Sequence, residues 1–260
     1  MRHQASGAET VSVEIPAPFV AVVTLDRSPV NALGRGIREQ LLSTFDALQD
    51  RDDVRAIVLT ARGKVFCAGA DIKEKQALGA SPGDHARANR LTREAFFCIL
   101  DNTKPVIAAV NGAALGAGFV LAACCDMISA AEDAVFAMPE IDVGLGGGAS
   151  FLQRILPAAK MRRMMLTGER VPAAELYRLG AVEACLPRDE VLRAAVEVAR
   201  AIAEKSPLAV RTIRDSFSTV AGLSLREGFH VEQAYTTTLS KTEDAAEARR
   251  AFVEKRKPIF

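Results

Sequence analysis

The sequence predicts an α/β fold that ends in a helical C-terminal part. Two observations lead to this. Short apolar strands precede helical segments through the first 150 residues, and from Phe151 onward the apolar spacing is helical nearly to the end. Strands followed by helices, and then helices alone, are typical of an α/β core with appended helices.

A third observation is an uncharged stretch from Pro105 to Cys125. Its length would allow a membrane span. However, the turn signal Asn111-Gly112 interrupts it, and it is rich in Ala and Gly. The stretch therefore predicts a buried strand at Val106–Val110 and a buried helix that starts near Leu115, and no membrane partner.

The remaining elements follow from periodicity and turn residues. Apolar runs predict strands at 11–15, 19–25, 54–60, 127–130 and 134–138. Helical spacing predicts helices at 36–48 and 86–100. Loops are expected at 26–33, at 62–74 and, rich in glycine, at 139–150.

Composition excludes several classes of function. Lys and Arg number 33 and Asp and Glu 32, so the chain lacks the basic excess usual in nucleic-acid-binding proteins. The cysteines are odd in number and form no C-x-x-C pair, which predicts neither a disulfide framework nor a zinc site. They are at positions 67, 98, 124, 125 and 185. No secretory signal is visible at the N-terminus, so we expect a cytoplasmic protein with reduced thiols.

Three motif classes are absent or incomplete. The segment Gly144–Ala149 matches the dinucleotide-binding pattern, but no strand directly precedes it and no second strand follows, so no nicotinamide site is expected. Neither a nucleophile elbow nor a phosphate-binding P-loop is present. His3, His85 and His230 are scattered, and we expect them on the surface rather than in a catalytic triad or a metal site.

Two loops combine backbone freedom with apolar surroundings: Cys67–Asp71 and Leu115–Gly118. Both follow expected strands, and both could turn backbone N–H groups towards a ligand oxygen. Two such donors on one thioester carbonyl would form an oxyanion hole and stabilise an enolate. The alternative is that both are tight turns that simply require glycine.

Glu140 follows an expected strand and a proline and precedes the glycine-rich run. A carboxylate in an apolar pocket has a raised pKa, which suits a proton shuttle near neutral pH. A solvated glutamate in a loop is the alternative.

Seven ordered blocks across nearly the whole chain resemble the crotonase superfamily, the enoyl-CoA hydratase/isomerase family. The blocks are NAL at 31–33, AIVLT at 56–60, FCAGADIKE at 66–74, PVIAAVNGAALGAG at 105–118, FAMPEIDVGL at 136–145, MLTGERV at 165–171 and AFVEKRKPIF at 251–260. The resemblance implies a spiral of ββα turns (residues 1–200) with a C-terminal helical trimerisation region (201–260). It also implies an acyl-CoA substrate, no separate cofactor, and a homotrimer or hexamer.

The resemblance places the oxyanion donors on the N–H groups of Ala70 and Ala117. It places Lys73 near the CoA phosphates, and Phe252 and Lys255 near the adenine of a neighbouring subunit. The other positions implied to bind substrate or CoA are Ala68, Gly69, Asp71, Ile72, Gly116 and Val120.

The chain departs from the family pattern at informative positions. Hydratases of this family carry two glutamates, of which the second matches Glu140 but the first falls on Val120. The aspartate of dienoyl-CoA isomerases falls on Gly148, and the usual proline after Glu140 is missing. Asp142 could be a second acid, although alternation in an extended segment would turn it away from the face of Glu140. Tyr235 is a weaker candidate.

Moving a double bond needs one base, whereas adding water needs a second group to orient the water. The single glutamate therefore favours isomerase-type chemistry over hydration, which stays the alternative. A different possibility is a weakly active CoA-binding or RNA-binding scaffold. The near-neutral charge argues against RNA, and the retained Glu140 argues against an inactive site.

Overall fold

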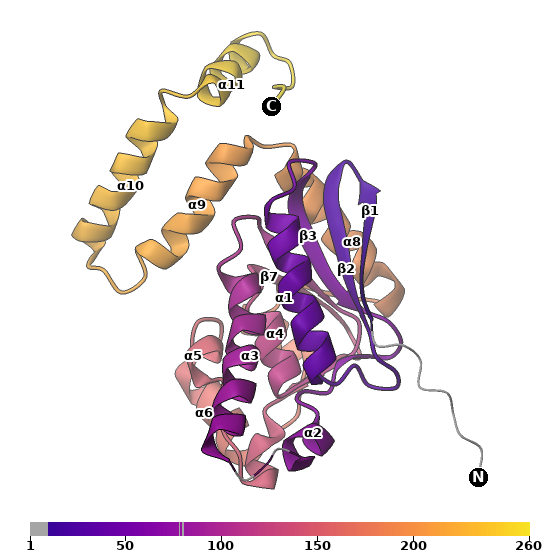
Figure 1. Cartoon of the computed structure of the whole chain (residues 1–260). Coiled ribbons are helices and arrows are strands. Elements are labelled where there is room, and N and C mark those ends of the chain that lie inside the picture. The colour runs from indigo at the N-terminus through magenta and orange to yellow at the C-terminus, as the bar shows by residue number, and fades with distance from the viewer. Residues whose placement is uncertain (1–9, 78, 80) are drawn as a thin grey trace.

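The computed structural model describes residues 10–77, 79 and 81–260. Figure 1 shows a layered α/β core from which the last helices extend to one side. The strands are β1 (Thr10–Ala17), β2 (Phe19–Asp26), β3 (Val54–Ala61), β4 (Val65–Cys67), β5 (Val106–Val110), β6 (Ala113–Leu115), β7 (Met127–Ala131), β8 (Val135–Ala137), β9 (Val171–Pro172) and β10 (Ala184–Leu186). The helices are α1 (Arg35–Gln49), α2 (Ile72–Ala77), α3 (Pro82–Leu100), α4 (Ala117–Ala123), the 3₁₀ helix η1 (Pro139–Val143), α5 (Ala149–Leu152), α6 (Ala158–Thr167), α7 (Ala173–Arg178), α8 (Arg188–Ala203), α9 (Pro207–Thr219), α10 (Leu225–Leu239) and α11 (Glu243–Val253).

The strands form two sheets. The larger has the order β1-β2-β3-β5-β7-β10, in which only β1 is antiparallel to its neighbour. The smaller has the order β4-β6-β8-β9, with β9 antiparallel. Three successive turns therefore each add one strand to the large sheet, one to the small sheet and then a helical segment. This is the expected spiral of ββα turns.

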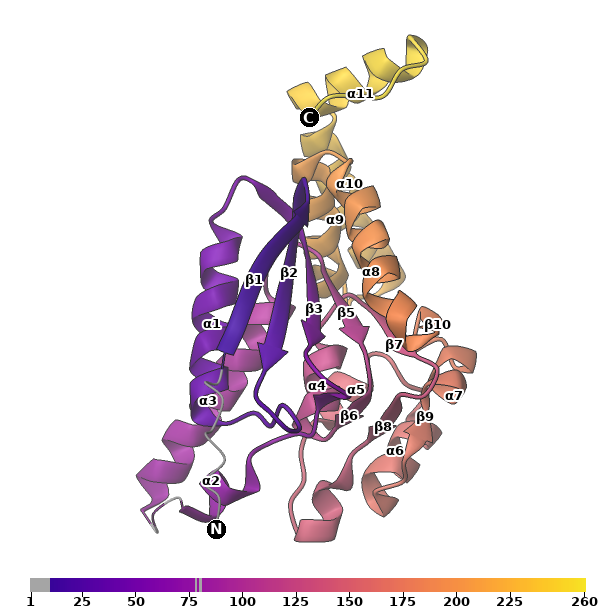
Figure 2. The ribbon, with the colours of Figure 1, turned by 90° about the vertical axis from the view of Figure 1, so that its right-hand side faces the viewer.

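Helices cover the large sheet on two sides. α8 packs against β2, β3, β5 and β7, whereas α1 packs against α3 and β1. Figure 2 shows α1 and α3 on the opposite side of the sheet from α8. Because the sheet is covered in this way, all five residues of β5 are buried, as its uninterrupted apolar sequence predicts.

The predicted buried helix of the central stretch is present as α4, in which six of the seven residues are buried. It begins at Ala117 rather than near Leu115, because Ala113–Leu115 forms β6 between β4 and β8. A three-residue strand of small side chains has no periodicity that sequence reasoning could detect.

Two other expectations are corrected. The segment predicted as a glycine-rich loop begins with η1, which Pro139 initiates and Gly144 ends in the left-handed region. The C-terminal segment, expected to be helical nearly throughout, contributes β10 to the edge of the large sheet, where it pairs in parallel with β7. Main-chain pairing to an existing sheet edge decides that outcome, and local sequence does not show it.

The C-terminal helices extend beyond the core, with α9 beside α10 and α11 at the far end (Figures 1 and 2). The expected boundary after residue 200 falls in the last turn of α8. Several large apolar side chains on α9, α10 and α11 are exposed: Ile213, Phe217, Leu225, Phe229, Phe252 and Val253. In the described part of the chain, no helix has the length and apolar character to cross a membrane.

Candidate active site

Glu140 lies in the first turn of η1, directly after β8. Its Oε1 lies 2.2 Å from the position that a Cβ atom on Gly116 would occupy. Its Oε2 is buried and has no hydrogen-bond partner in the described structure. Burial raises the pKa of this carboxyl group, opposed in part by hydrogen bonds from backbone N–H groups, including that of Ala117. The carboxylate is thus partly desolvated and keeps one oxygen free to accept a proton.

The loop before α4 brings a backbone donor to this carboxylate. Gly116 has φ of +53°, a value that side chains disfavour, and its N–H donates to Ala137 O over 2.8 Å. This bond joins the loop to β8 and so fixes it relative to Glu140. Ala117 then starts α4 with its N–H near the carboxylate.

The two loops predicted to carry oxyanion donors touch each other. A Cβ atom on Gly69, which has φ of +96°, would lie 2.8 Å from Leu115 O and 3.5 Å from Ala117 N. Only glycine permits this backbone approach. The loop Cys67–Asp71, which carries Ala70, therefore packs directly against the start of α4, as an oxyanion hole made of the Ala70 and Ala117 N–H groups requires.

Val120 is an apolar residue at the position where hydratases of the resembled family carry a second glutamate. It lies on α4, is 3% exposed, and its Cγ2 is 2.8 Å from where a Cβ atom on Gly148 would be. The methyl group of Met138 lies 2.9 Å from the same point. The side chains of Val120 and Met138 on this side of the site are apolar, so neither could orient a water molecule as a carboxylate would.

The two weaker acid candidates lie elsewhere. The segment containing Asp142 is a 3₁₀ helix and not extended, and its carboxylate lies beside Gly168 at the end of α6, 3.1 Å from that glycine's ideal Cβ position. Tyr235 on α10 donates from its hydroxyl group to Asp215 on α9 over 2.9 Å. Figure 1 shows α10 at the opposite end of the molecule from α2, so Tyr235 does not meet the site within one chain.

The family model described as enoyl-CoA hydratase/isomerase matches residues 17–260. The chain belongs to the enoyl-CoA hydratase/isomerase family.

Relatives of this family are similar over nearly their full length. A Mycobacterium tuberculosis protein named (7aS)-7a-methyl-1,5-dioxo-2,3,5,6,7,7a-hexahydro-1H-indene-carboxyl-CoA hydrolase is 37% identical over 242 residues, which cover 92% of this chain and 97% of that protein. A probable mitochondrial enoyl-CoA hydratase of Dictyostelium discoideum is 37% identical over 245 residues, covering 93% and 87%. The crystal structure of an enoyl-CoA hydratase from Bacillus anthracis superposes with a TM-score of 0.91 at 31% identity, covering 96% and 98%. The chain is therefore an enzyme of the hydratase/isomerase type with the crotonase fold.

In this hydratase/isomerase-family chain, the candidates for the CoA end fall into two groups. Ile72 and Lys73 are exposed on α2, directly after the loop Cys67–Asp71, whereas Ala68 donates its N–H to Val30 O. Phe252, 85% exposed, and Lys255 lie at the far end of α11. Because α11 and α2 are at opposite ends of the molecule (Figure 1), the two groups do not meet within one chain. Their joint role in CoA binding stays a prediction that requires a neighbouring subunit.

Asp71 has contacts that the sequence did not reveal. Its carboxylate accepts hydrogen bonds from Arg27 Nη2 over 2.6 Å and from the N–H groups of Lys73 and Glu74 at the start of α2. Burial opposes ionisation, but these hydrogen bonds together hold the pKa of the Asp71 carboxyl group below its ordinary value. Nothing in the local sequence around Arg27 signals this long-range pairing.

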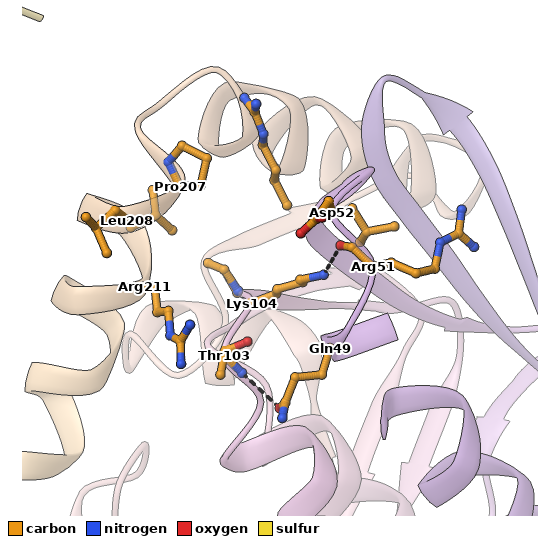
Figure 3. Close-up of a pocket in the computed structure, with 12 residues that line it drawn as sticks. Gln49, Arg51, Asp52, Thr103, Lys104, Pro207, Leu208 and Arg211 are labelled. Atoms are coloured by element: carbon orange, nitrogen blue, oxygen red, sulfur yellow. Dashed lines mark hydrogen bonds between the residues drawn. The ribbon is translucent and has the colours of Figure 1, made fainter. Parts of the chain in front are cut away.

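A cavity of about 340 Å³ opens at the other end of the sheet, before β3 and β5 and beside α9 (Figure 3). Its lysine, Lys104, donates to the carbonyl groups of Leu48 and Arg51, so this cation joins the end of α1 and the segment before β3 to the segment before β5. Burial lowers the pKa of Lys104. Glu140 does not line this cavity.

Lys75 on α2 lies close enough to Glu140 for its charge to oppose the rise in the pKa of that carboxyl group. His85 and His230 are exposed, as expected, and His3 lies outside the described residues. In the described ranges, no group of three or more His, Cys, Asp or Glu side chains could hold a metal ion. All five cysteines are free, and burial raises the pKa of the Cys67 thiol to about 12.

Proposed function

We propose that this enzyme binds an acyl-CoA thioester, stabilises its enolate with the N–H groups of Ala70 and Ala117, and moves protons with Glu140 alone. One observation carries the proposal. The Glu140 carboxylate lies next to the Ala117 N–H with a buried, unpaired Oε2, whereas the α4 position that matches the other glutamate of the family's hydratases is the apolar Val120.

The proposed step is a double-bond shift through a dienolate. Oε2 of Glu140 removes a proton from the carbon between the thioester carbonyl and the double bond, and the C–H electron pair moves into the conjugated system. Negative charge develops on the thioester oxygen, where the two backbone N–H groups stabilise it. The Glu140 carboxylic acid then returns the proton to the γ-carbon, which leaves a 2-enoyl thioester and a regenerated carboxylate. The raised pKa makes Glu140 a stronger base for the first transfer and brings it closer to neutral pH, where one group can both accept and return a proton.

Hydration is the second candidate, because relatives such as the Dictyostelium protein are named hydratases. Addition of water needs a group that orients the water while Glu140 handles the α-proton. Val120 cannot do so, and Asp142 lies beside Gly168 rather than Glu140. A water molecule held by backbone groups is the remaining route to a hydratase.

A substrate panel tests the proposal. Purified enzyme is given 2-enoyl-, 3-enoyl- and aryl-CoA thioesters in D₂O, and product structure and deuterium content are read by mass spectrometry. Thioesters with a second carbonyl group are included because of the name of the M. tuberculosis relative. Deuterium incorporation with migration of the double bond, faster than hydration, supports the proposal. Hydration of a 2-enoyl-CoA as the fastest reaction replaces it with the second candidate.

We also propose that the enzyme is a homotrimer or hexamer assembled through residues 201–260. The exposed apolar side chains on α9, α10 and α11 support this, because such surfaces are normally covered by a partner. In that assembly Phe252 and Lys255 would complete the CoA site of a neighbour.

A further inference from the structure

We propose that Arg27 and Glu74 are positioning residues of the oxyanion hole, which hold the Ala70 N–H at its place through Asp71 and α2. This inference rests on the proposed function, because it assigns residues to the same thioester-binding site. It concerns the Ala70 donor and not the proton shuttle.

The loop that carries Ala70 is tied to the segment that follows β2. Leu33 donates its N–H to Gly69 O over 2.8 Å, and Leu33 and Ala70 form an isolated parallel bridge. Arg27 reinforces the tie, because Nη1 donates to Ala32 O over 3.0 Å while Nη2 donates to Asp71. One guanidinium group therefore holds both sides of the bridge.

Glu74 connects the same loop to α1. Its two carboxylate oxygens accept the N–H of Arg35, the first residue of α1, over 2.9 and 2.8 Å, and Arg38 donates to it over 3.1 Å. A carboxylate at a helix N-terminus satisfies a donor that the helix leaves unpaired and interacts favourably with the helix dipole. α2 is thus attached to the start of a long, well-packed helix.

These polar contacts matter because α2 has little else to hold it. None of its six residues, Ile72–Ala77, is buried. Apolar packing therefore does not fix its position, and Asp71, Glu74 and their arginine partners do. Only Asp71 separates the donor on Ala70 from this helix, so loosening the network would move the donor relative to Ala117.

The first test measures the oxyanion hole without turnover. A conjugated aryl-enoyl thioester, cinnamoyl-CoA, absorbs at longer wavelength when hydrogen bonds polarise its carbonyl group. We expect bound cinnamoyl-CoA to show this red shift in the native enzyme, and Arg27→Gln and Glu74→Gln each to reduce the shift by at least half. Arg27→Lys, which keeps a charged donor, should retain more of it than Arg27→Gln.

Kinetics provide the second readout. A misplaced donor should lower kcat on the best substrate by roughly tenfold to a hundredfold, in line with the cost of small misplacements, and should change KM by less than about threefold because most binding contacts remain. Arg62→Gln is the matched control, since Arg62 is an arginine paired with Asp26 and has no contact with Asp71 or Glu74. It should leave both the red shift and kcat unchanged.

The outcomes separate this inference from the proposed function. The positioning role would be overturned if folded Arg27→Gln and Glu74→Gln keep the full red shift and the native kcat. It would also be overturned if the Arg62→Gln control loses as much red shift and kcat as they do. If Arg27→Gln does not fold, Glu74→Gln alone decides by the same criteria. Glu140→Gln should keep the red shift while losing turnover. If it keeps turnover, the single-base mechanism is wrong, but the positioning role is still decided by the red shift.

Discussion

Glu140 fits against Gly116 so closely that no side chain could be accommodated between them. A Cβ atom on Gly116 would lie 2.2 Å from Oε1 of Glu140 and 2.9 Å from its Cδ. The positive φ of Gly116 adds a second reason for glycine, since other residues there are strained by about 1–3 kcal/mol. The candidate base and the start of α4 are therefore one packed unit.

We expect Gly116→Ala to displace the Glu140 carboxylate and lower turnover by roughly a hundredfold. Steady-state kinetics on the best acyl-CoA substrate, together with denaturant unfolding, would measure this. Gly146→Ala is the control, because no atom lies within 4 Å of its ideal Cβ and its φ is not positive. Equal activity of both variants would show that the Gly116–Glu140 contact is not required.

Glu140→Gln should reduce turnover by at least roughly a hundredfold, the low end for loss of a general acid–base group. Acyl-CoA should still bind, which calorimetry with a non-reactive thioester would measure. In the native enzyme, kcat/KM should rise with pH through the raised pKa of Glu140, because the base must be ionised to accept a proton. Near-normal turnover of the variant would exclude Glu140 as the base.

The same substitution should stabilise the fold at neutral pH. The pKa of Glu140 is higher in the folded chain than in the unfolded chain, so ionisation favours unfolding. The penalty is fully present above the folded pKa and disappears as pH falls below the unfolded value of about 4.3. Thermal unfolding of both proteins would be measured from about pH 4, near the unfolded pKa of glutamate, to about pH 8. Glu140→Gln should have the higher Tm at neutral pH, and the two Tm values should converge at the acidic end. A constant difference across this range would contradict the prediction.

Val120→Glu should raise the hydration of crotonyl-CoA, because a carboxylate there could orient a water molecule. We expect a modest gain, since the site is apolar and a second carboxylate near Glu140 raises the pKa of one of the two. Loss of the conjugated enoyl absorbance would measure the rate, with Val120→Gln as the uncharged control. If the native enzyme already hydrates crotonyl-CoA as fast as a two-glutamate hydratase, another group holds the water and the single-base mechanism is wrong.

Light scattering at micromolar concentration should show a trimer or hexamer. Leu225 on α10 is 91% exposed, and burying such a side chain typically contributes about 1.5–3 kcal/mol. Leu225→Glu should therefore shift the protein towards smaller species, at a concentration where the native assembly is intact. A fully active native monomer would rule out both the assembly and the shared CoA site.

Sequence alone could predict much of the fold and nominate the candidate site residues. The uncharged run that contains Val106–Val110 marks a strand covered on both faces, because only such a strand can be apolar at every position. Pro139 and the glycines around the two loops likewise indicate where backbone is constrained or exposed. These signals are local, since they depend on period, turn chemistry and the absence of side chains.

The contacts that make the site were decided only by the tertiary structure. The fit of Glu140 against Gly116, the packing of Gly69 on Leu115, and the bond from Arg27 to Asp71 join residues from different turns of the spiral. β10 and η1 also escaped prediction, because pairing at a sheet edge and a single 3₁₀ turn leave no periodic trace. The sequence by itself determined which groups are available. Which of them lie within hydrogen-bonding reach depends on how distant segments pack. A three-residue strand forms only beside the strands that pair with it, and a glycine is required only where another segment packs against its backbone.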